Sequence, residues 1–297
     1  RYIIKGKKAR KMALLGSALF LFNPAVWYNS SVWGQYDSVI NFFVLLAFYF
    51  LFQKKLVRAV LALFLSIYIK ASLLIFVPVF LVVALKQKYK VKKYILSVAF
   101  SLLLISIVTY PFSRGEPFGW LYYLYKDKIF KNQLQVITAN AFNIWAGLTG
   151  INEQPHTLTL GPLTYQVWGI ILYVTSYIPV LYLVIKDKRP TNVFWALAIV
   201  AFSSFSLLTN MHERYLYPIF PVFSIIAVAN PGLLPVYAFI SVLNLINMYH
   251  IWWYPRVEFV VEAFSAYDKL LPRILGFVGF GLFVYLYLRF LRHLRNA

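Results

Sequence analysis

The sequence consists mainly of long apolar runs separated by short polar segments. A helix needs roughly 20 apolar residues to cross the hydrocarbon core of a bilayer, and fewer where other helices surround it. Hydrophobic residues make up 61% of the 297, and charged residues only 13%. The runs are too long and too continuously apolar for the alternating strands of a membrane β-barrel. The sequence therefore predicts an all-α, polytopic transmembrane helical bundle.

The apolar runs predict about ten spans in a single transmembrane domain that covers residues 1–297. The longest polar interval, 113–162, is expected as a loop on one face of the membrane. The candidate spans are Met12 to Tyr28, Ser38 to Phe52, Leu56 to Ile69, Ala71 to Leu85, Tyr94 to Phe112, Leu163 to Ile185, Val193 to Thr209, Leu216 to Ala229, Leu233 to Trp253 and Leu270 to Leu288.

Threading these spans alternately through the membrane separates the charges. One side receives 20 of the 29 basic residues: six before Met12, three around Lys54, five between Lys86 and Lys93, three around Lys186 and three after Leu288. The other side receives eight of the nine acids, all but Asp187. Cytoplasmic loops carry the excess of Lys and Arg, so both termini are predicted to be cytoplasmic and the loop at 113–162 to lie outside.

The charge balance excludes several classes of function. A net charge of +20 would suggest nucleic acid as the partner of a soluble protein. Here most basic residues lie on one side of the predicted membrane spans, so no nucleic-acid partner is expected. There is no glycine-rich phosphate loop, and the absence of cysteine rules out disulfides and thiolate metal sites. No compact spacing of His and Asp indicates a metal site, so neither a metal nor another cofactor is expected.

A cluster of ionisable residues lies between two apolar runs. His212, Glu213 and Arg214 follow the run that ends at Thr209 and precede Ile219 to Ala229. Ionisable groups at membrane depth are functional candidates by default. In the alternative interpretation, Glu213 and Arg214 only neutralise each other, while Tyr215 and the nearby Tyr217 join an aromatic belt.

Lys70 separates two short apolar runs, Leu56 to Ile69 and Ala71 to Leu85. One interpretation is that its long side chain extends to the outer interface. The other is a broken helix pair whose junction opens on a cavity and presents the charge there.

The outer loops contain further polar candidates. Trp33, Gln35, Tyr36 and Asp37 form a surface suited to carbohydrate, although Asp37 or Ser38 also fits the N-cap of the next helix. In the long loop, 118–131 mixes rings with lysines and suits a helix in the interface plane, either guiding lipid entry or only covering the bundle's rim. Asn140 and Asn143 are three residues apart, so one helical face would offer both amides to a sugar.

Three motifs together resemble the GT-C superfamily of integral-membrane glycosyltransferases, in particular prokaryotic proteins related to the second mannosyltransferase of GPI-anchor synthesis. They are 23–37, which ends in Trp-Gly-Gln-Tyr-Asp, then 139–145, and 211–218, which reads Met-His-Glu-Arg-Tyr-Leu-Tyr-Pro. The resemblance implies transfer of a hexose, mannose in the related mannosyltransferases, from a polyprenyl-phosphate carrier to a lipid, glycan or protein acceptor outside the cytoplasm. It also implies a catalytic aspartate in a first outer loop that this chain, which starts at Arg1, does not contain; an N-terminal section is therefore expected to be missing.

Such a transfer needs a carboxylate to take the acceptor's proton and cations to stabilise the leaving phosphate. Lys70 and Arg214, together with His212, are the positive groups on the outer side close to apolar spans. Glu213 is expected to orient Arg214. Asp37 is the other acid close to a span and is the second choice for the base, after the aspartate of the absent loop. Asp37 and Glu213 are therefore the candidate catalytic residues within this sequence. The competing class is a transporter or flippase for a glycolipid or anionic substrate, which an inverted repeat would favour; none is apparent.

Overall fold

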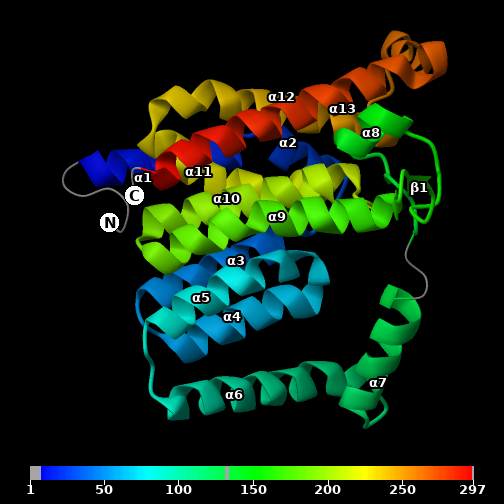
Figure 1. Ribbon diagram of the computed structural model, residues 1–297. Helices are drawn as coiled ribbons and strands as arrows, with labels where there is room; N and C mark the ends of the chain where they lie inside the picture. Colours follow the sequence, from blue (N-terminus) through cyan, green and yellow to red (C-terminus); the bar gives the residue numbers. More distant parts are fainter. Residues whose placement is uncertain (1–7, 131–133, 296–297) are drawn as a thin grey trace.

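The computed structural model describes residues 8–130 and 134–295. Nearly all of its regular structure is helical (Figure 1), which confirms the all-α class. The helices are α1 (Lys8–Leu21), α2 (Pro24–Trp27), α3 (Asp37–Phe52), α4 (Leu56–Ile69), α5 (Val77–Lys86), α6 (Val91–Thr109), α7 (Pro117–Leu124), α8 (Ile144–Thr149), α9 (Tyr165–Lys186), α10 (Pro190–Leu207), α11 (Ile219–Ala229), α12 (Leu234–Trp252) and α13 (Glu258–Arg295). Strands β1 (Thr159–Leu160) and β2 (Leu163–Thr164) form an antiparallel hairpin.

Five helical segments are long and apolar enough to cross a membrane, so this is a membrane protein. They are Val91–Phe112, Tyr165–Lys186, Pro190–Leu207, Pro231–Trp252 and Glu258–Arg295. Three further apolar helical segments, Asp37–Phe52, Leu56–Ile69 and Ala71–Lys86, are shorter. At 1.5 Å per residue, the 14 residues of α4 extend only about 21 Å, less than the hydrocarbon core of roughly 30 Å. Helix length alone therefore supports five spans rather than ten.

The first apolar run is not one continuous helix. Asn23 ends α1 and caps α2, since its side-chain oxygen accepts hydrogen bonds from the backbone N–H groups of Ala25 and Val26. Pro24 is compatible with the first turn of the new helix, where its missing N–H would have no partner. A π-helical turn, Tyr28–Val32, then leads into the loop before α3. The predicted span from Met12 to Tyr28 is thus divided, which redirects the chain towards Asp37.

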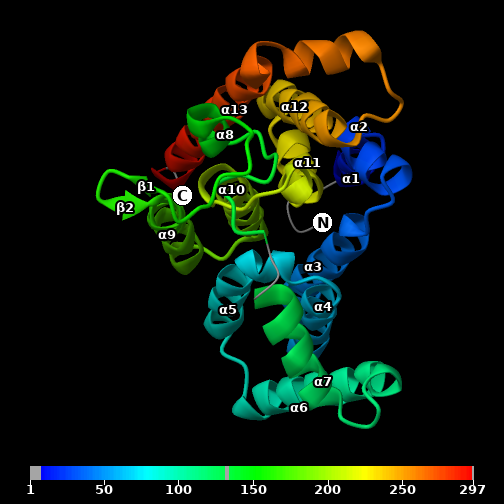
Figure 2. The same ribbon diagram turned by 90° about the vertical axis from the view of Figure 1, so that its right-hand side faces the viewer.

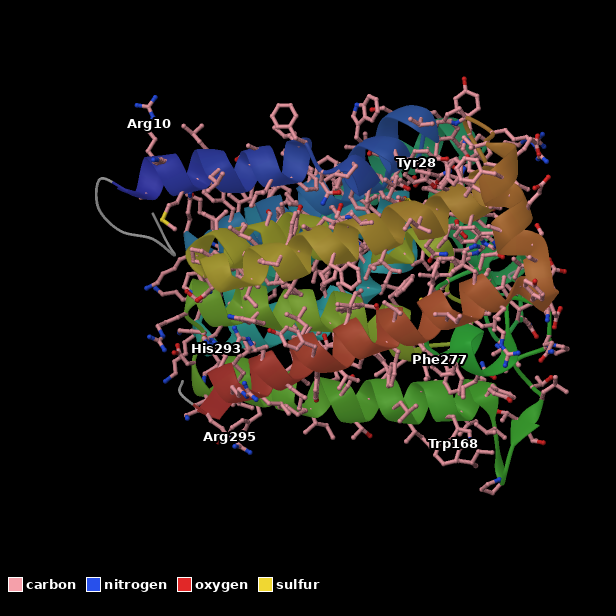
Figure 3. The ribbon with its side chains drawn as sticks, turned by 90° about the horizontal axis from the view of Figure 1, so that it is seen from above. Arg10, Tyr28, Trp168, Phe277, His293 and Arg295 are labelled. Carbon is pink, nitrogen blue, oxygen red and sulfur yellow. The ribbon has the colours of Figure 1, made fainter. Side chains whose placement is uncertain are left out.

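The long helices run side by side, with the start of α1 and the end of α13 at the same end of the bundle (Figure 1). Figure 3 shows Arg10, His293 and Arg295 together there, away from Tyr28 and Trp168. Hydrogen bonds join the connections at this end: Gln87 donates to the carbonyl of Leu51, and Lys188 to that of Lys86. We call this the basic end, and the opposite end, with residues 113–162, the loop end.

Helix α10 lies at the centre of the bundle (Figure 2), and every residue from Asn192 to Leu207 is buried. It packs against α9, α11 and α13. Helix α6 is the opposite case, because it packs against α4 at the edge of the bundle. Only 17% of its most apolar stretch of 18 residues is buried. The strongest constraint on sequence therefore falls on α10, which leads directly into the charged cluster.

Helix α13 packs closely on the loop end through two glycines. A Cβ atom at Gly276 would lie 2.8 Å from the carbonyl oxygen of Asn143, and one at Gly279 would lie 2.5 Å from that of Phe142. Real Cβ atoms do not approach backbone so closely, so any larger residue would force the two segments apart. These glycines position the segment before α8 against the membrane helices.

Residues 117–130 of the long loop are helical, as expected for the segment 118–131; Lys131 and the basic residues before Lys8 lie outside the described residues. Helix α7 lies at a steep angle to α6 (Figure 1). The rings of Phe118, Tyr122 and Tyr123 are exposed on it. An apolar ring surface on a helix across the end of a bundle suits the interface plane.

Candidate functional site

The charged cluster is held by a short backbone ladder at the loop end. After α10 the chain reverses at Asn210, whose φ is 63°, and its N–H donates to the carbonyls of Val136 and Ile137. Ala139 donates to the carbonyl of Met211, and His212 forms bridges with both Ala139 and Asn140. A 3₁₀ turn, Glu213–Leu216, follows and leads into α11. The ladder thus fixes the charged residues between two buried helices.

Glu213 and Arg214 form an ion pair within this turn. Arg214 Nη1 lies 2.7 Å from Glu213 Oε1, and the Glu213 side chain is 2% exposed. Burial raises the pKa of the Glu213 carboxyl, and the neighbouring guanidinium of Arg214 opposes that shift. Asn244 of α12 donates to the Glu213 backbone carbonyl at 3.0 Å. Glu213 therefore has the geometry of a group that orients Arg214, rather than of a base open to substrate.

Arg214 also lies against aromatic rings. Its Cζ is 5.3 Å from the centre of the Trp33 ring and 5.6 Å from that of Tyr215, and Trp33 stacks on Trp252 at 5.6 Å. Rings at this distance attract a guanidinium. Its Nε is buried and has no hydrogen-bond partner in the described part of the chain. Arg214 is thus held in place by one carboxylate and two rings, with donor capacity left over.

Asp37 and Lys70 form the second charged pair. Lys70 Nζ lies 2.6 Å from Asp37 Oδ1, and Asn29 donates to Oδ2 at 3.3 Å. Asp37 is the first residue of α3, and no side chain caps that helix, so the N-cap interpretation of Asp37 was wrong. Its carboxylate is directed to Lys70 instead.

The helix does break at Lys70, as the broken-pair hypothesis requires. Lys70 is extended, with φ −157° and ψ 122°, between the end of α4 and a 3₁₀ turn, Ala71–Phe76, that precedes α5. Its side chain is 16% exposed, and Nζ lies 5.4 Å from the ring centres of both Tyr36 and Tyr215. The ammonium group thus points into the bundle towards Asp37, not out to an interface.

Two cavities flank the Asp37–Lys70 pair, one lined by Asp37 and the other by Lys70. The first, which we call the inner pocket, has a volume of about 100 Å³ and is lined by Asp37, Ser72, Ile75, Ser204, Leu208, Met211, Arg214, Tyr215 and Pro218. The second, the aromatic groove, has a volume of about 390 Å³ and is lined by Tyr68, Ile69, Lys70, Ala71, Phe112, Trp120, Leu121, Leu124 and Tyr125. Lys70 lines the groove while its ammonium group contacts Asp37 of the pocket, so it links the two.

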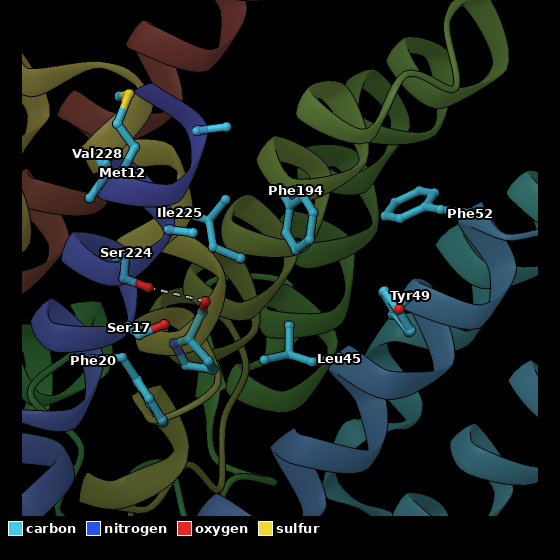
Figure 4. A pocket seen from close by; sticks show the side chains of 14 residues that line it. Met12, Ser17, Phe20, Leu45, Tyr49, Phe52, Phe194, Ser224, Ile225 and Val228 are labelled. Atoms are coloured by element: carbon cyan, nitrogen blue, oxygen red, sulfur yellow. Dashed lines mark hydrogen bonds between the residues drawn. The ribbon is translucent and has the colours of Figure 1, made fainter. Parts of the chain in front are cut away.

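Another large cavity is apolar and lies towards the basic end. It occupies about 390 Å³ between α1, α3, α10 and α11, and Figure 4 shows Leu45 and Phe52 on one side of it and Phe194 and Ile225 on the other. No charged side chain lines it. The chemistry therefore belongs to the loop end.

His212, the third positive candidate from the sequence, lies beside Glu213. Its Nδ1 lies 3.9 Å from Glu213 Oε2, and its ring contacts Tyr215 edge-on at 5.0 Å. Burial, with the positive charges of Arg214 and Lys70, lowers the pKa of His212 to about 4. This shift favours the neutral imidazole at pH 7, and the ring packs against Tyr215.

The remaining carbohydrate-binding candidates divide. Trp33 contacts Arg214 in the charged cluster, whereas the backbone N–H of Gln35 donates to the carbonyl of Asn29. The prediction that Asn140 and Asn143 share a helical face was wrong, because Asn140 has a φ of 68° and Asn143 is the N-cap of α8. The Asn143 side-chain nitrogen also donates to the carbonyl of Phe205, so both the oxygen and the nitrogen of this amide form hydrogen bonds within the protein.

Two amides in α12 support the site and were missed. Asn244 holds the backbone of Glu213, and Asn247 both accepts from Phe142 N–H and donates to the carbonyl of Asn140. Both are buried. Amides three residues apart in an otherwise apolar span are a signal that the sequence contains, because polar groups inside a membrane helix need partners.

Within residues 8–130 and 134–295, no three His, Asp or Glu side chains lie close enough together to hold one metal ion. The site consists of two acids and two cations on three segments, namely the start of α3, the junction after α4 and the 3₁₀ turn 213–216, with rings and amides around them. No protein-family model matches the sequence and no curated protein matches it, so the function is inferred from the residues of this site.

Proposed function

We propose that this protein is a membrane glycosyltransferase that moves a hexose, with mannose as the proposed sugar, from a polyprenyl-phosphate carrier to a lipid, glycan or protein acceptor. The observation that carries the proposal is the Asp37–Lys70 pair at 2.6 Å, which joins a carboxylate pocket containing Arg214 to an apolar groove. A carboxylate beside two cations, next to a lipid-sized apolar surface, suits a substrate that is both an anion and a lipid.

In the proposed reaction, Asp37 takes the proton of an acceptor hydroxyl while that oxygen bonds to the anomeric carbon of the sugar. The bond from the anomeric carbon to the carrier phosphate breaks, and the electron pair leaves with the phosphate. Lys70 and Arg214 stabilise the charge that develops there. The aromatic groove holds the first part of the polyprenyl chain, and Glu213 positions Arg214.

The proposal includes a GT-C-like arrangement of about ten spans, in which α1, α3, α4, the segment 71–86 and α11 join the five longer helices. Helices shorter than the bilayer are compatible with this where neighbours cover them. It also assigns the basic end to the cytoplasm and the loop end to the opposite side. A prokaryotic cell membrane would then hold the site on its outer face.

We expect a single cysteine introduced at Asn152 to react with a membrane-impermeant maleimide in intact cells. Asn152 is exposed at the loop end, and the chain has no native cysteine to interfere. A cysteine at Lys88, which is in the α5–α6 connection at the basic end, should react only after permeabilisation. The reverse pattern would contradict the assigned orientation.

We expect Lys70→Met to weaken binding of the polyprenyl-phosphate donor about tenfold or more, since a charge-assisted hydrogen bond to phosphate contributes roughly 1.5–3 kcal/mol. Donor affinity is measured by equilibrium binding to the purified protein. Lys88→Met, far from the site, is the matched control. Unchanged donor affinity in Lys70→Met would mean that Lys70 serves only to neutralise Asp37.

Arg214→Lys is expected to lower donor affinity or turnover about tenfold although it keeps the charge, because only Arg offers a planar fork that binds two phosphate oxygens at once. Release of the carrier phosphate from the lipid-linked sugar is the measurement, with expression and thermal stability recorded alongside. Wild-type turnover in Arg214→Lys, with Arg214→Ala impaired only by loss of folded protein, would make the cluster structural.

The alternative function, a transporter, is distinguished from a transferase by whether the lipid-linked sugar is chemically changed. Protein reconstituted in liposomes is given polyprenyl-phosphate mannose labelled in the sugar, with a lipid extract as acceptor. A transferase moves the label onto a new molecule and releases polyprenyl phosphate. A transporter would carry the intact lipid-linked sugar across the membrane, with no change in its chemical form.

A further inference from the structure

A second polar cavity at the loop end contains none of the charged residues of the proposed reaction. It has a volume of about 280 Å³ and is lined by Leu134, Gln135, His156, Gln166, Ile170, Leu208, Thr209 and Asn210. We call it the polar groove. Its volume is close to the lower end of the range for small-molecule sites, about 300 Å³. None of the side chains that line it is an acid, a lysine or an arginine, so its chemistry differs from that of the inner pocket.

Backbone hydrogen bonds hold the walls of the polar groove together. His156 N–H donates to the carbonyl of Gln135, and Gln166 N–H donates to the carbonyl of His156. Asn210 N–H donates to the carbonyls of Val136 and Ile137. Three separate chain segments are thus tied to one another around the cavity, which makes it a built site with a defined shape.

The inner residues of the polar groove are buried, and the residues around its opening, which we call the rim, are exposed to solvent. His156 and Thr209 are each 8% exposed, whereas Gln135 and Gln166 are exposed on the rim with the apolar side chains of Leu134 and Ile170. Amides and hydroxyls beside apolar surface suit a ligand that has both hydroxyl edges and C–H faces. The opening lies at the loop end, outside the helical bundle.

Two polar atoms of the lining have no partner. His156 Nδ1 and Asn210 Oδ1 are enclosed and make no hydrogen bond to any of the residues that the structure describes. A buried polar atom without a partner is destabilising, so such atoms are rare and need an explanation. Burial also lowers the pKa of His156, which favours a neutral ring with one nitrogen free to accept.

We propose that the polar groove binds an uncharged sugar ring, which belongs to the acceptor. Its lining offers amide donors, amide oxygens, a hydroxyl and a neutral imidazole, and it offers no cation for a phosphate or carboxylate. Leu208 lines both the polar groove and the inner pocket, so the bound sugar lies beside the pocket that contains Asp37. The identification of this sugar as the acceptor rests on the proposed function; the binding of a neutral sugar does not.

The test is direct binding of methyl hexosides to the purified protein by saturation-transfer NMR. The probes are methyl α-mannoside and methyl α-glucoside, with glucuronic acid as the charged comparison. We expect saturable binding of a neutral glycoside and weaker binding of glucuronic acid. Gln166→Met removes a rim amide, and Asn210→Gly removes a lining amide while accepting the φ of 63°. Each variant should raise the Kd about threefold to tenfold.

Thr157→Val is the matched control, because Thr157 is exposed next to His156 but does not line the groove. Its Kd should equal that of the wild type. The proposal is overturned if no glycoside binds saturably, if both amide variants bind as the wild type does, or if glucuronic acid binds more tightly. Glycoside binding requires no transfer, so loss of transfer in Asp37 variants bears only on the proposed function.

Discussion

Asp37→Asn is expected to reduce hexose transfer by roughly 10²–10⁴-fold, the range over which a positioned general base contributes. The amide keeps the shape of the carboxylate but cannot take the acceptor's proton. Because Asn29 and Lys70 both contact the Asp37 carboxylate, the side chain is already held in one orientation. The measurement is the initial rate of label transfer from polyprenyl-phosphate mannose, at saturating donor.

A loss of hexose transfer in Asp37→Asn must be distinguished from a loss of stability, because the substitution also leaves Lys70 without its counter-ion. The double variant Asp37→Asn/Lys70→Met removes both charges, so we expect it to recover thermal stability and to stay inactive. Asp187→Asn is the matched control, since Asp187 pairs with Arg189 at the basic end. Wild-type transfer by Asp37→Asn would remove this residue from the reaction, and recovery of transfer in the double variant would assign it a structural role.

Glu213→Leu is expected to lower the free energy of unfolding by about 3 kcal/mol, the lower end of the range for breaking a buried ion pair, because Arg214 then loses its counter-ion. The lower end applies since the Arg214 side chain is 20% exposed. Glu213→Gln should cost less, as its amide oxygen still accepts a hydrogen bond from Arg214. Denaturant titration of the purified protein in micelles measures both.

Glu258→Leu is the control for this prediction, because Glu258 forms an exposed ion pair with Arg256 and should change stability little. If Glu213→Leu were as stable as Glu258→Leu, the buried pair would not hold the turn. A stable Glu213→Gln variant with reduced transfer would show that the carboxylate charge itself positions Arg214 for the phosphate.

The class of fold followed from the sequence because apolar composition is a direct physical requirement of the bilayer. The charged residues of the site were also identifiable from the sequence. Lys70 and the segment 212–214 interrupt apolar runs, and charged side chains at membrane depth are energetically costly and therefore rare outside functional sites. Arg10 and Arg295, from the two ends of the chain, lie at the same end of the bundle (Figure 3). Functional roles for these residues stay predictions.

The sequence did not reveal which residues far apart in the chain contact one another. The contact of Asp37 with Lys70 joins residues 33 apart, and that of Asn244 with Glu213 joins residues 31 apart. Neither follows from local periodicity. The error at Asn143 has a similar origin: spacing of three suggests a helical face, but the amide side chain competes for backbone N–H groups and starts α8 instead. Helix ends set by single side chains, as at Asn23, likewise divided a run that hydropathy alone treats as one.

The burial of α10 has a consequence for how the protein assembles during synthesis. Helix α9 precedes α10 in the chain, but α11 and α13, which cover its other surfaces, are made later. When α10 first enters the membrane, lipid must therefore occupy the surfaces that protein covers in the finished fold. The apolar character of α10 is thus required by this intermediate, and the charged turn after it acquires its final surroundings only when the C-terminal helices have been inserted.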